Sequence, residues 1–227
     1  MKWRIFLYAV AVGFALIAVL ALVVAKFPLE SREIVYRAAP PFSDDEADAR
    51  IERKVGPFLE KDYLGEVDIK GAQAALSELD WVEFCSVRRS PPSTIVITVK
   101  PKRIIGSVVL ADGGFMPVDS RGKMINERFA EAFLPLVAGP GGAARLPRLL
   151  AFLSDYPEIK PRLKSANRIH ALRWDLTIAG KGGDVLLRLP ADEAARALVD
   201  AIRTDLLSGT IAEVDMRAGS KIFVKER

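Results

Sequence analysis

The chain opens with a stretch that fixes much of its architecture, because residues Ile5 to Ala25 contain no charged side chain. As a helix these 21 residues are about 30 Å long, which matches the hydrocarbon core of a bilayer. We therefore predict a single transmembrane helix at residues 5–25, after a short tail at residues 1–4. Lys2 and Arg4 precede the stretch without an acidic residue, so the positive-inside rule places the tail in the cytoplasm and the rest outside.

A cleaved signal peptide is the alternative interpretation of this stretch. Val23 and Ala25 are small enough to precede a cleavage site. The apolar region of a signal peptide usually has only about 7 to 15 residues, so the length favours an uncleaved anchor.

The composition predicts two folded modules after the anchor. A chain of 227 residues, 50% of them apolar and 27% charged, is long enough to bury two small cores. The formal net charge of +4 is spread along the chain with no basic run. Nucleic acid is therefore not an expected partner.

Residue types that carry enzyme chemistry are sparse. Cys85 is the only cysteine and His170 the only histidine, which excludes an intramolecular disulfide and a site with several histidine ligands. The glycine-rich segment 139–145 lacks the Lys and Ser or Thr of a phosphate-binding loop. We interpret Cys85 as a small buried side chain and His170 as a surface residue, and expect no catalytic residues, metal, cofactor or small-molecule substrate.

The first module begins with a short strand and two helices. Residues 31–38, with the apolar residues Ile34 and Val35, are expected to form the strand. Ser43, followed by Glu46 three residues later, forms a capping box that predicts the start of a helix. We expect Gly56 and Pro57 to end that helix. Asp68 is the expected N-cap of a second helix.

A hairpin follows the two helices. Residues 81–89 and 93–100 are rich in Val, Ile, Thr and aromatic residues, and the intervening sequence RSPPS supplies a turn. The expected order of elements is therefore strand, helix, helix, strand, strand.

This order and the residues of the hairpin resemble the POTRA domain of the FtsQ/DivIB family of bacterial division proteins. The family pattern has Trp-Val after an apolar helix, then a small residue, an arginine and a proline. The matching residues here are Trp81, Val82, Cys85, Arg89 and Pro92. The resemblance implies that Trp81 fills the joint between helix and strand.

The second half contains further motifs of the same family in the same order. They are FMPVDSRG, LPLVAG, the hairpin at residues 172–190 that contains RWDL, and VDMR. We expect Pro147 to begin one helix and residues 192–207 to form another. The residues at motif positions are Asp119, Gly122, Pro135, Gly139, Trp174, Asp175 and Asp215.

The predicted fold class is α+β. It comprises the N-terminal transmembrane helix, a POTRA domain at residues 31–101, and a C-terminal antiparallel β-rich domain with helices at residues 102–227.

The last segment, KIFVKE at residues 221–226, is apolar in the middle and charged at both ends. A strand of this kind at a sheet edge can pair with a partner strand. The resemblance implies this mode, because FtsQ proteins hold the small coiled-coil proteins FtsB and FtsL partly by strand addition. A strand that only completes the core is the alternative. The candidate partner-binding residues are Arg217, Ala218, Ile222, Phe223 and Val224.

The resemblance implies a non-enzymatic scaffold of the division complex. Such a protein is a single-pass type II protein of the bacterial inner membrane, with most of the chain in the periplasm at the septum, and reaches the septal wall-synthesis enzymes through FtsB and FtsL. A POTRA-type chaperone or transport component is one alternative, although those proteins usually carry serial POTRA repeats or a barrel. A membrane-anchored cell-wall enzyme is another, and it would need a carboxylate pair or a nucleophile system.

Overall fold

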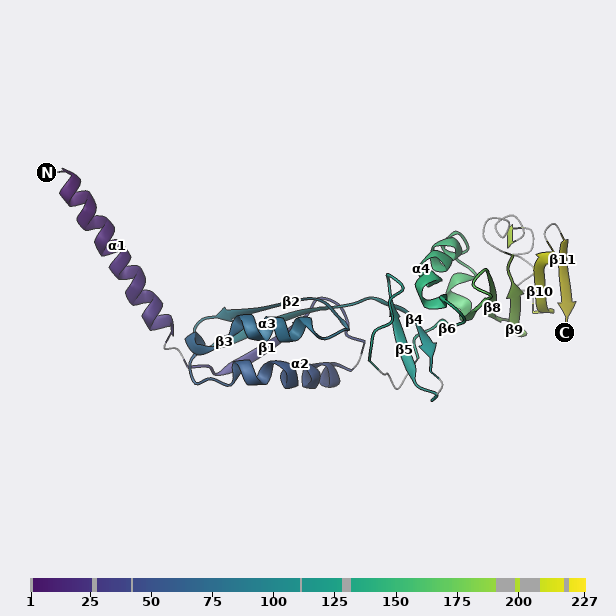
Figure 1. Cartoon of the computed structure of the whole chain (residues 1–227), viewed down its shortest axis with the longest axis horizontal. Helices are drawn as coiled ribbons and strands as arrows, with labels where there is room; N and C mark the ends of the chain where they lie inside the picture. The colour runs from purple at the N-terminus through teal and green to yellow at the C-terminus, as the bar shows by residue number, and fades with distance from the viewer. Residues whose placement is uncertain are drawn as a thin grey trace. The chain divides into compact units, whose positions relative to one another are not determined.

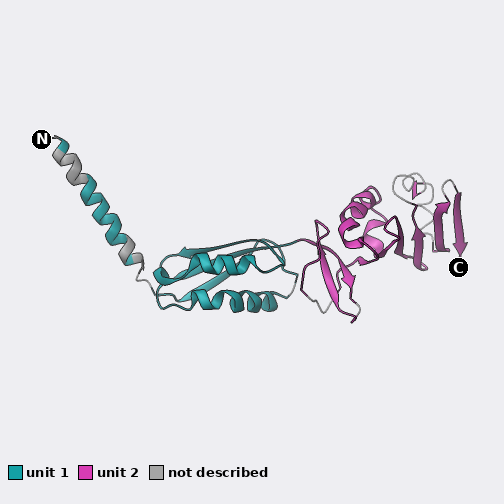
Figure 2. Ribbon diagram, in the orientation of Figure 1, with its two compact units in different colours: residues 1–102 teal, residues 103–227 magenta. Residues whose placement is uncertain are grey.

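The structure, a computed structural model, describes residues 2–25, 28–41, 43–110, 112–127, 132–190, 199–200, 209–218 and 221–227. Contacts between residues divide the chain into two compact units, Met1–Lys102 and Arg103–Arg227 (Figure 2).

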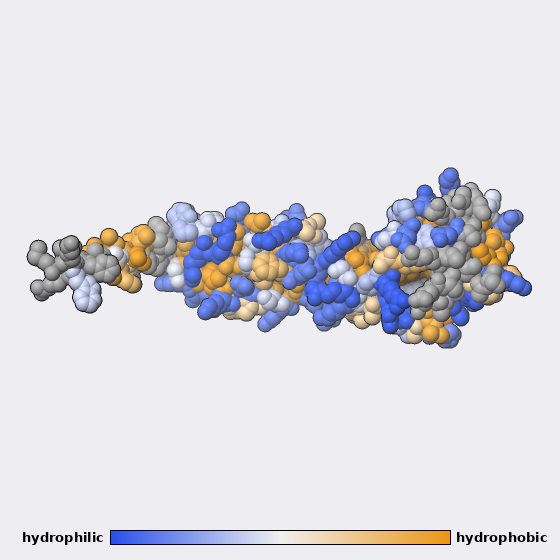
Figure 3. All heavy atoms as spheres, turned by 90° about the horizontal axis from the view of Figure 1, so that it is seen from above, coloured by the Kyte–Doolittle hydropathy of each residue, from blue (hydrophilic) through white to orange (hydrophobic). Residues whose placement is uncertain are grey.

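The first unit begins with helix α1, Lys2–Ala25 (Figure 1). Its described apolar side chains, such as Phe14 and Ile17, are exposed, and they form the orange surface of this helix in Figure 3. Within the described part of the chain, we find no helix that is both long and apolar enough to cross a membrane. The transmembrane helix at residues 5–25 therefore stays a prediction.

The remainder of the first unit is a three-stranded sheet with two helices on one face (Figure 1). The strand order is β1-β3-β2, with β1 parallel and β2 antiparallel to the central strand β3. This succession of elements confirms the order predicted from the sequence. The elements are β1 (Ser31–Tyr36), α2 (Asp44–Leu59), the short 3₁₀ helix η1 (Leu64–Glu66), α3 (Ile69–Ser77), β2 (Val82–Ser90) and β3 (Thr94–Pro101).

Helix α2 begins after its predicted N-cap, and its buried residues have the spacing of one helix face. The Ser43 hydroxyl accepts a hydrogen bond from the Glu46 amide at 3.3 Å, and the buried residues recur about every four positions along the helix. The prediction that Gly56 and Pro57 end the helix was wrong, since α2 continues to Leu59. A proline in the last turn removes one hydrogen bond only, and Glu60 N still donates to Gly56 O at 2.9 Å.

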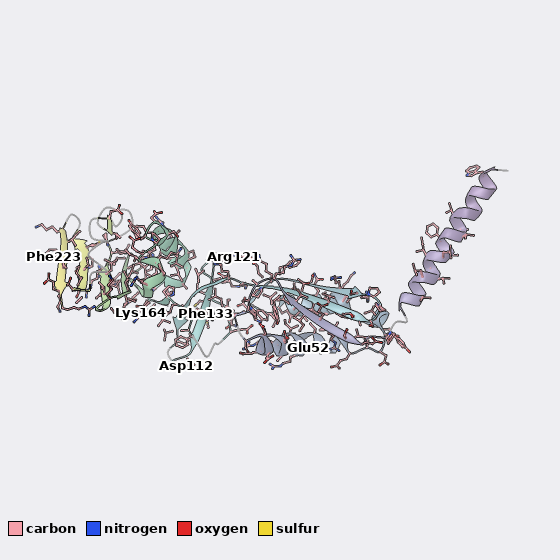
Figure 4. The ribbon with its side chains drawn as sticks, turned by 180° about the vertical axis from the view of Figure 1, so that it is seen from behind. Glu52, Asp112, Arg121, Phe133, Lys164 and Phe223 are labelled. Atoms are coloured by element: carbon pink, nitrogen blue, oxygen red, sulfur yellow. The ribbon has the colours of Figure 1, made fainter. Side chains whose placement is uncertain are left out.

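Two polar contacts fasten β1 to α2. The Tyr36 hydroxyl donates to Asp48 Oδ1 at 2.7 Å, and Arg32 Nη1 pairs with Glu52 Oε2 at 2.9 Å (Figure 4 labels Glu52). Burial, followed by the bond to Asp48, raises the pKa of Tyr36. The phenol is therefore held in its neutral, donating form.

Trp81 lies between the end of α3 and the start of β2 and is fully buried. Its carbonyl accepts a hydrogen bond from Lys102 N at 2.8 Å, at the end of β3. Asp68 caps α3 as predicted, accepting a bond from Gly71 N at 2.9 Å. The indole thus occupies the joint at which the chain changes from helix to strand.

The second unit is built on one sheet of eight strands in the order β11-β10-β9-β8-β7-β6-β4-β5. Helix α4 (Gly142–Phe152) covers part of one face, and its Leu146 and Leu149 share a core with Leu176 and Leu187 of the sheet. Two short 3₁₀ helices follow α4, η2 (Leu153–Asp155) and η3 (Lys160–Arg162). The strands are β4 (Ile104–Val109), β5 (Phe115–Asp119), β6 (Leu136–Ala138), β7 (Leu163–Ile169), β8 (Arg173–Gly180), β9 (Gly183–Arg188), β10 (Ile211–Ala218) and β11 (Lys221–Glu226).

The prediction of an antiparallel domain was correct for the hairpins and wrong for the whole sheet. The pairs β4–β6, β6–β7 and β9–β10 are parallel. Parallel neighbours need a crossover connection, and the segments between these strands are long enough to provide one. The unit therefore has a mixed sheet, and the chain remains α+β.

Helix α4 also begins earlier than predicted. It starts at Gly142, and Pro147 lies inside it. A Cβ on Gly142 would lie 2.9 Å from Val137 Cγ1, so the glycine lets the first turn approach β6 closely. The helix expected at residues 192–207 lies outside the described residues except for residues 199–200, which are helical.

Candidate partner-binding edge

The two edges of the eight-stranded sheet differ in how they are covered. At one end, the chain after β5 returns along its outer side, where Pro117 O accepts a bond from Ile125 N at 2.8 Å and Asp119 N donates to Lys123 O at 2.9 Å. At the other end, β11 pairs with β10 and with no other described strand (Figure 1). Within the described chain, β11 is therefore the open edge.

The direction of the backbone groups of β11 follows from one hydrogen bond. Arg227 N donates to Thr210 O at 3.0 Å, toward the β10 side. Successive residues of a strand direct their backbone N–H and C=O groups to opposite sides. The backbone groups of Lys225 and Phe223 therefore point toward β10, as those of Arg227 do. The amides and carbonyls of Ile222 and Val224 therefore face away from β10, and no described strand pairs with them there.

The side chains of β11 alternate between the two faces of the sheet. Val224 lies opposite Val214, which is fully buried, and Phe223 lies opposite Asp215. Ile222 and Val224 therefore lie on the core face and Phe223 on the other face. Ile222 packs against the core, whereas Val224 is 48% exposed and Phe223 is 57% exposed. Figure 4 shows Phe223 on this outermost strand.

A row of charged side chains leads across the outer face to Phe223. Asp175 of β8, Arg188 of β9 and Asp215 of β10 are successive neighbours in the register. Arg188 Nε lies 3.0 Å from Glu213 Oε1 and 4.0 Å from Asp175 Oδ2. The guanidinium of Arg188 therefore balances acidic groups from both adjacent strands.

Arg217, expected as a polar contact for a partner, has an acidic neighbour on its own strand. Its Nε lies 2.8 Å from Asp215 Oδ1 and 2.9 Å from Oδ2, and its backbone N donates to Oδ1 at 3.0 Å. These bonds, opposed by desolvation and assisted by the charge of Arg188, lower the pKa of Asp215 to about 2. Ala218, the remaining predicted contact, is exposed at the end of β10 opposite Lys221.

Three of the predicted motif residues lie in the first unit and do not belong to the β11 edge. Trp81 and Val82 are buried at the start of β2. Arg89 fastens the loop before α3, since its Nε donates to Leu64 O at 2.8 Å and its Nη2 to Val67 O at 2.6 Å. These residues act on the fold of the POTRA-like unit.

The motif residues 119–139 build turns of the second unit. The buried Asp119 carboxylate accepts bonds from Arg121 N and Lys123 N, both at 2.9 Å. Gly122 has a positive φ of 80°. Pro135 O accepts a bond from Ser107 N at 3.1 Å, and Gly139 has a positive φ of 85°.

The structure places three predicted motif residues on β8 and β10, in the same sheet as the edge strand. Trp174 is half-buried against the core, while Asp175 and Asp215 lie on the outer face. Arg188 and Glu213, which complete that charged row, are not among the residues predicted from the sequence. No local pattern could reveal them, because they become neighbours only when β9 and β10 pair.

The described residues contain no group of three or more His, Cys, Asp or Glu side chains able to hold a metal ion. Cys85 is buried, with its Sγ 3.4 Å from Ser77 Oγ. His170 is exposed in the turn between β7 and β8.

Comparison with protein families supports the assignment of both units. The description "POTRA domain, FtsQ-type" matches residues 47–100, and "Cell division protein FtsQ/DivIB, C-terminal" matches residues 108–217. The second match ends before β11. The edge strand must therefore be judged from this chain's own residues.

Several curated relatives are similar over most of the chain. A cell division protein FtsQ of Rhizobium radiobacter is 30% identical over 168 residues, which cover 70% of this chain and 77% of that protein. Those of Rhizobium meliloti and Novosphingobium aromaticivorans are 31% and 30% identical over 70% of this chain, but the match covers only 52% and 51% of their length. The fold and the matches define a POTRA-containing protein of bacterial cell division. The chain belongs to the FtsQ family.

Proposed function

We propose that this chain is a non-enzymatic scaffold of the bacterial division complex that binds a partner protein by strand addition at β11. The partners implied by the family resemblance are small FtsB-like and FtsL-like coiled-coil proteins, and through them the septal wall-synthesis enzymes. The observation that carries the proposal is the open edge, where no described strand pairs with the outward-facing backbone groups of Ile222 and Val224, beside an exposed Phe223.

The character of β11 supports a binding role over a purely structural one. Exposed edge strands with apolar side chains invite pairing with other chains, and proteins usually cover or shorten them. The opposite edge of this sheet is covered by residues 123–125. The six-residue strand β11 instead places Ile, Phe and Val at its centre. Strand addition would gain affinity from main-chain hydrogen bonds and specificity from these side chains.

We further propose that residues 5–25 anchor the chain in the inner membrane with both folded units in the periplasm. The uncharged sequence of this segment, the exposed apolar side chains of α1 and the basic residues before it support this orientation. In this proposal the POTRA domain at residues 31–101 and the β-rich domain at residues 102–227 carry all contacts outside the membrane.

Photo-crosslinking in living cells tests the partner and its position. A photoreactive residue at Phe223 should capture small single-span coiled-coil proteins, identified by mass spectrometry. A matched probe at Met124, which is also exposed but lies beside the covered edge, should not capture them. Equal capture at both positions, or none at Phe223 in a well-expressed protein, would remove β11 as the binding edge.

Proline substitution tests the strand-addition mode itself. Val224→Pro removes an outward-facing amide that a partner strand would use, so it should abolish capture of the partner. The fold should survive this change, because edge strands tolerate proline where the N–H faces solvent. Val224→Thr keeps both the amide and the strand propensity, so it should retain capture. Thermal unfolding of both full-length variants in detergent should stay close to wild type. A Val224→Pro protein that folds and still captures the partner would contradict strand addition.

A further inference from the structure

We propose that the strand received by β11 carries an acidic, apolar, apolar, apolar, acidic pattern, with its two acids facing Lys221 and Lys225. This inference rests on the proposed function and specifies the chemistry of the partner at the same edge. Lys221, Phe223 and Lys225 share the outer face of the sheet, and the lysines flank the ring symmetrically.

Among the described residues, Lys221 and Lys225 have no acidic partner. Lys221 and Lys225 are exposed, and neither makes an ion pair with any residue that the structure describes. These two lysines give the edge of the sheet a positive charge that faces any strand added to β11. Opposite charges placed directly across a strand pair stabilise it, whereas like charges destabilise it.

The two acidic residues of β10 that lie opposite β11 are already engaged. Glu213 lies opposite Lys225, but its carboxylate is 3.0 Å from Arg188 Nε. Asp215 lies opposite Phe223, but its carboxylate is held by Arg217. Arginines of β9 and β10 therefore neutralise the two acids opposite β11, and the lysine charges of β11 have no partner among the described residues.

The centre of the pattern follows from the three apolar residues. A residue opposite Phe223 would cover a ring that is now 57% exposed, on the same face as the two acids. Residues opposite Ile222 and Val224 would lie on the core face, where Val224 is 48% exposed beside the buried Val214. Apolar side chains at these three positions would extend the core by one strand.

The symmetry of the edge makes the pattern independent of strand direction. Lys221 and Lys225 lie two residues before and after Phe223. A parallel or antiparallel partner strand therefore presents the same order of side chains. The acids also bring the opposite charge to this positively charged edge, which should speed association at low ionic strength.

Two synthetic peptides and a charge-reversed variant test this inference. Fluorescent peptides with the central sequences Glu-Val-Phe-Val-Glu and Lys-Val-Phe-Val-Lys differ only in the charge that faces β11. Their binding to the full chain in detergent can be followed by fluorescence anisotropy. We expect the acidic peptide to bind wild type about tenfold more tightly at low salt, with a smaller ratio at high salt. The Lys221→Glu, Lys225→Glu double variant should invert this preference.

A double variant at a salt bridge elsewhere in the sheet controls for nonspecific charge effects. Exchanging Lys164 and Asp184, which pair on β7 and β9 at 2.8 Å (Figure 4 labels Lys164), should leave the peptide preference unchanged. Equal binding of both peptides, or an unchanged preference in the Lys221→Glu, Lys225→Glu protein, overturns the inference. The Val224→Pro variant separates the two proposals, because it tests strand addition with the native partner and no change of charge.

Discussion

Arg217 and Asp215 form a clamp within one strand, two residues apart on the outer face of β10. Arg217 Nε lies 2.8 Å and 2.9 Å from the two carboxylate oxygens. Phe223 is the cross-strand neighbour of Asp215. Arg217 therefore neutralises the Asp215 carboxylate, which lies opposite Phe223 of the open edge.

This clamp predicts an acid-dependent loss of stability. The pKa of Asp215 is about 2 in the folded protein against an ordinary value of 3.8, so its contribution is full above pH 4 and is lost as the pH falls toward 2. Because the pair is partly exposed, solvent screening should reduce that contribution to about 1 kcal/mol. Asp215→Asn should lower the free energy of unfolding by this amount at pH 6 and have little effect at pH 2.

The matched control for the clamp is Arg217→Gln. It should also lower the free energy of unfolding at pH 6, and the double variant should cost little more than Asp215→Asn alone. Urea unfolding of the full chain in detergent at both pH values measures these effects. Additive costs would show that the two side chains act independently.

Two glycines with almost the same backbone conformation should respond differently to alanine. Gly139 has a φ of 85°, and a Cβ there would lie 2.0 Å from Arg168 O, whereas Gly113 has a φ of 84° with nothing within 4 Å. Gly113→Ala should therefore cost only the backbone strain, about 1 kcal/mol. Gly139→Ala should cost at least about 3 kcal/mol, because backbone atoms must also move. Equal costs by denaturant unfolding would contradict this distinction.

The turn between β7 and β8 can be stabilised. His170 and Ala171 both have positive φ, 51° and 58°, and Leu172 N donates to Ile169 O at 3.1 Å across them. This geometry favours Asn and Gly at the two central positions. His170→Asn with Ala171→Gly should raise the free energy of unfolding by about 1 kcal/mol.

The same Ala→Gly change should have the opposite effect on stability when it is made in a helix. Ala144 is exposed within α4, so Ala144→Gly should lower the free energy of unfolding by about 1 kcal/mol. Thermal denaturation of the two proteins should shift in opposite directions. A loss of stability in the turn variant would contradict the conformational argument.

Trp81 should dominate the stability of the first unit. Its fully buried side chain fills the joint between α3 and β2, and removing an aromatic side chain from such a site costs about 3 to 5 kcal/mol. Hydrogen exchange of the full-length Trp81→Ala protein should show lost protection in β2 and β3. Protection in the strands of the second unit should remain.

The POTRA-like unit could be predicted closely because its signals are local. Ser43 and Asp68 mark helix starts through their own side-chain bonds, and the hairpin after Trp81 is rich in Val, Ile and Thr, which favour strands. The two prolines misled the prediction for a physical reason. Pro57 and Pro147 each remove one backbone donor, but α2 and α4 each continue through their own proline.

The sequence alone determined the apolar N-terminal stretch, the order of elements in the first unit, the hairpin at residues 172–190 and the strand at residues 221–226. Each depends on periodicity, caps or turn residues within a short segment. Only the tertiary structure decided that the large sheet is mixed, that residues 123–125 cover one edge, and that β11 forms the open one. It also decided that Arg188 and Arg217 engage the acids beside β11 while Lys221 and Lys225 remain unpaired within the described chain. Strand partners are chosen by contacts between residues far apart in sequence, and no local pattern encodes that choice.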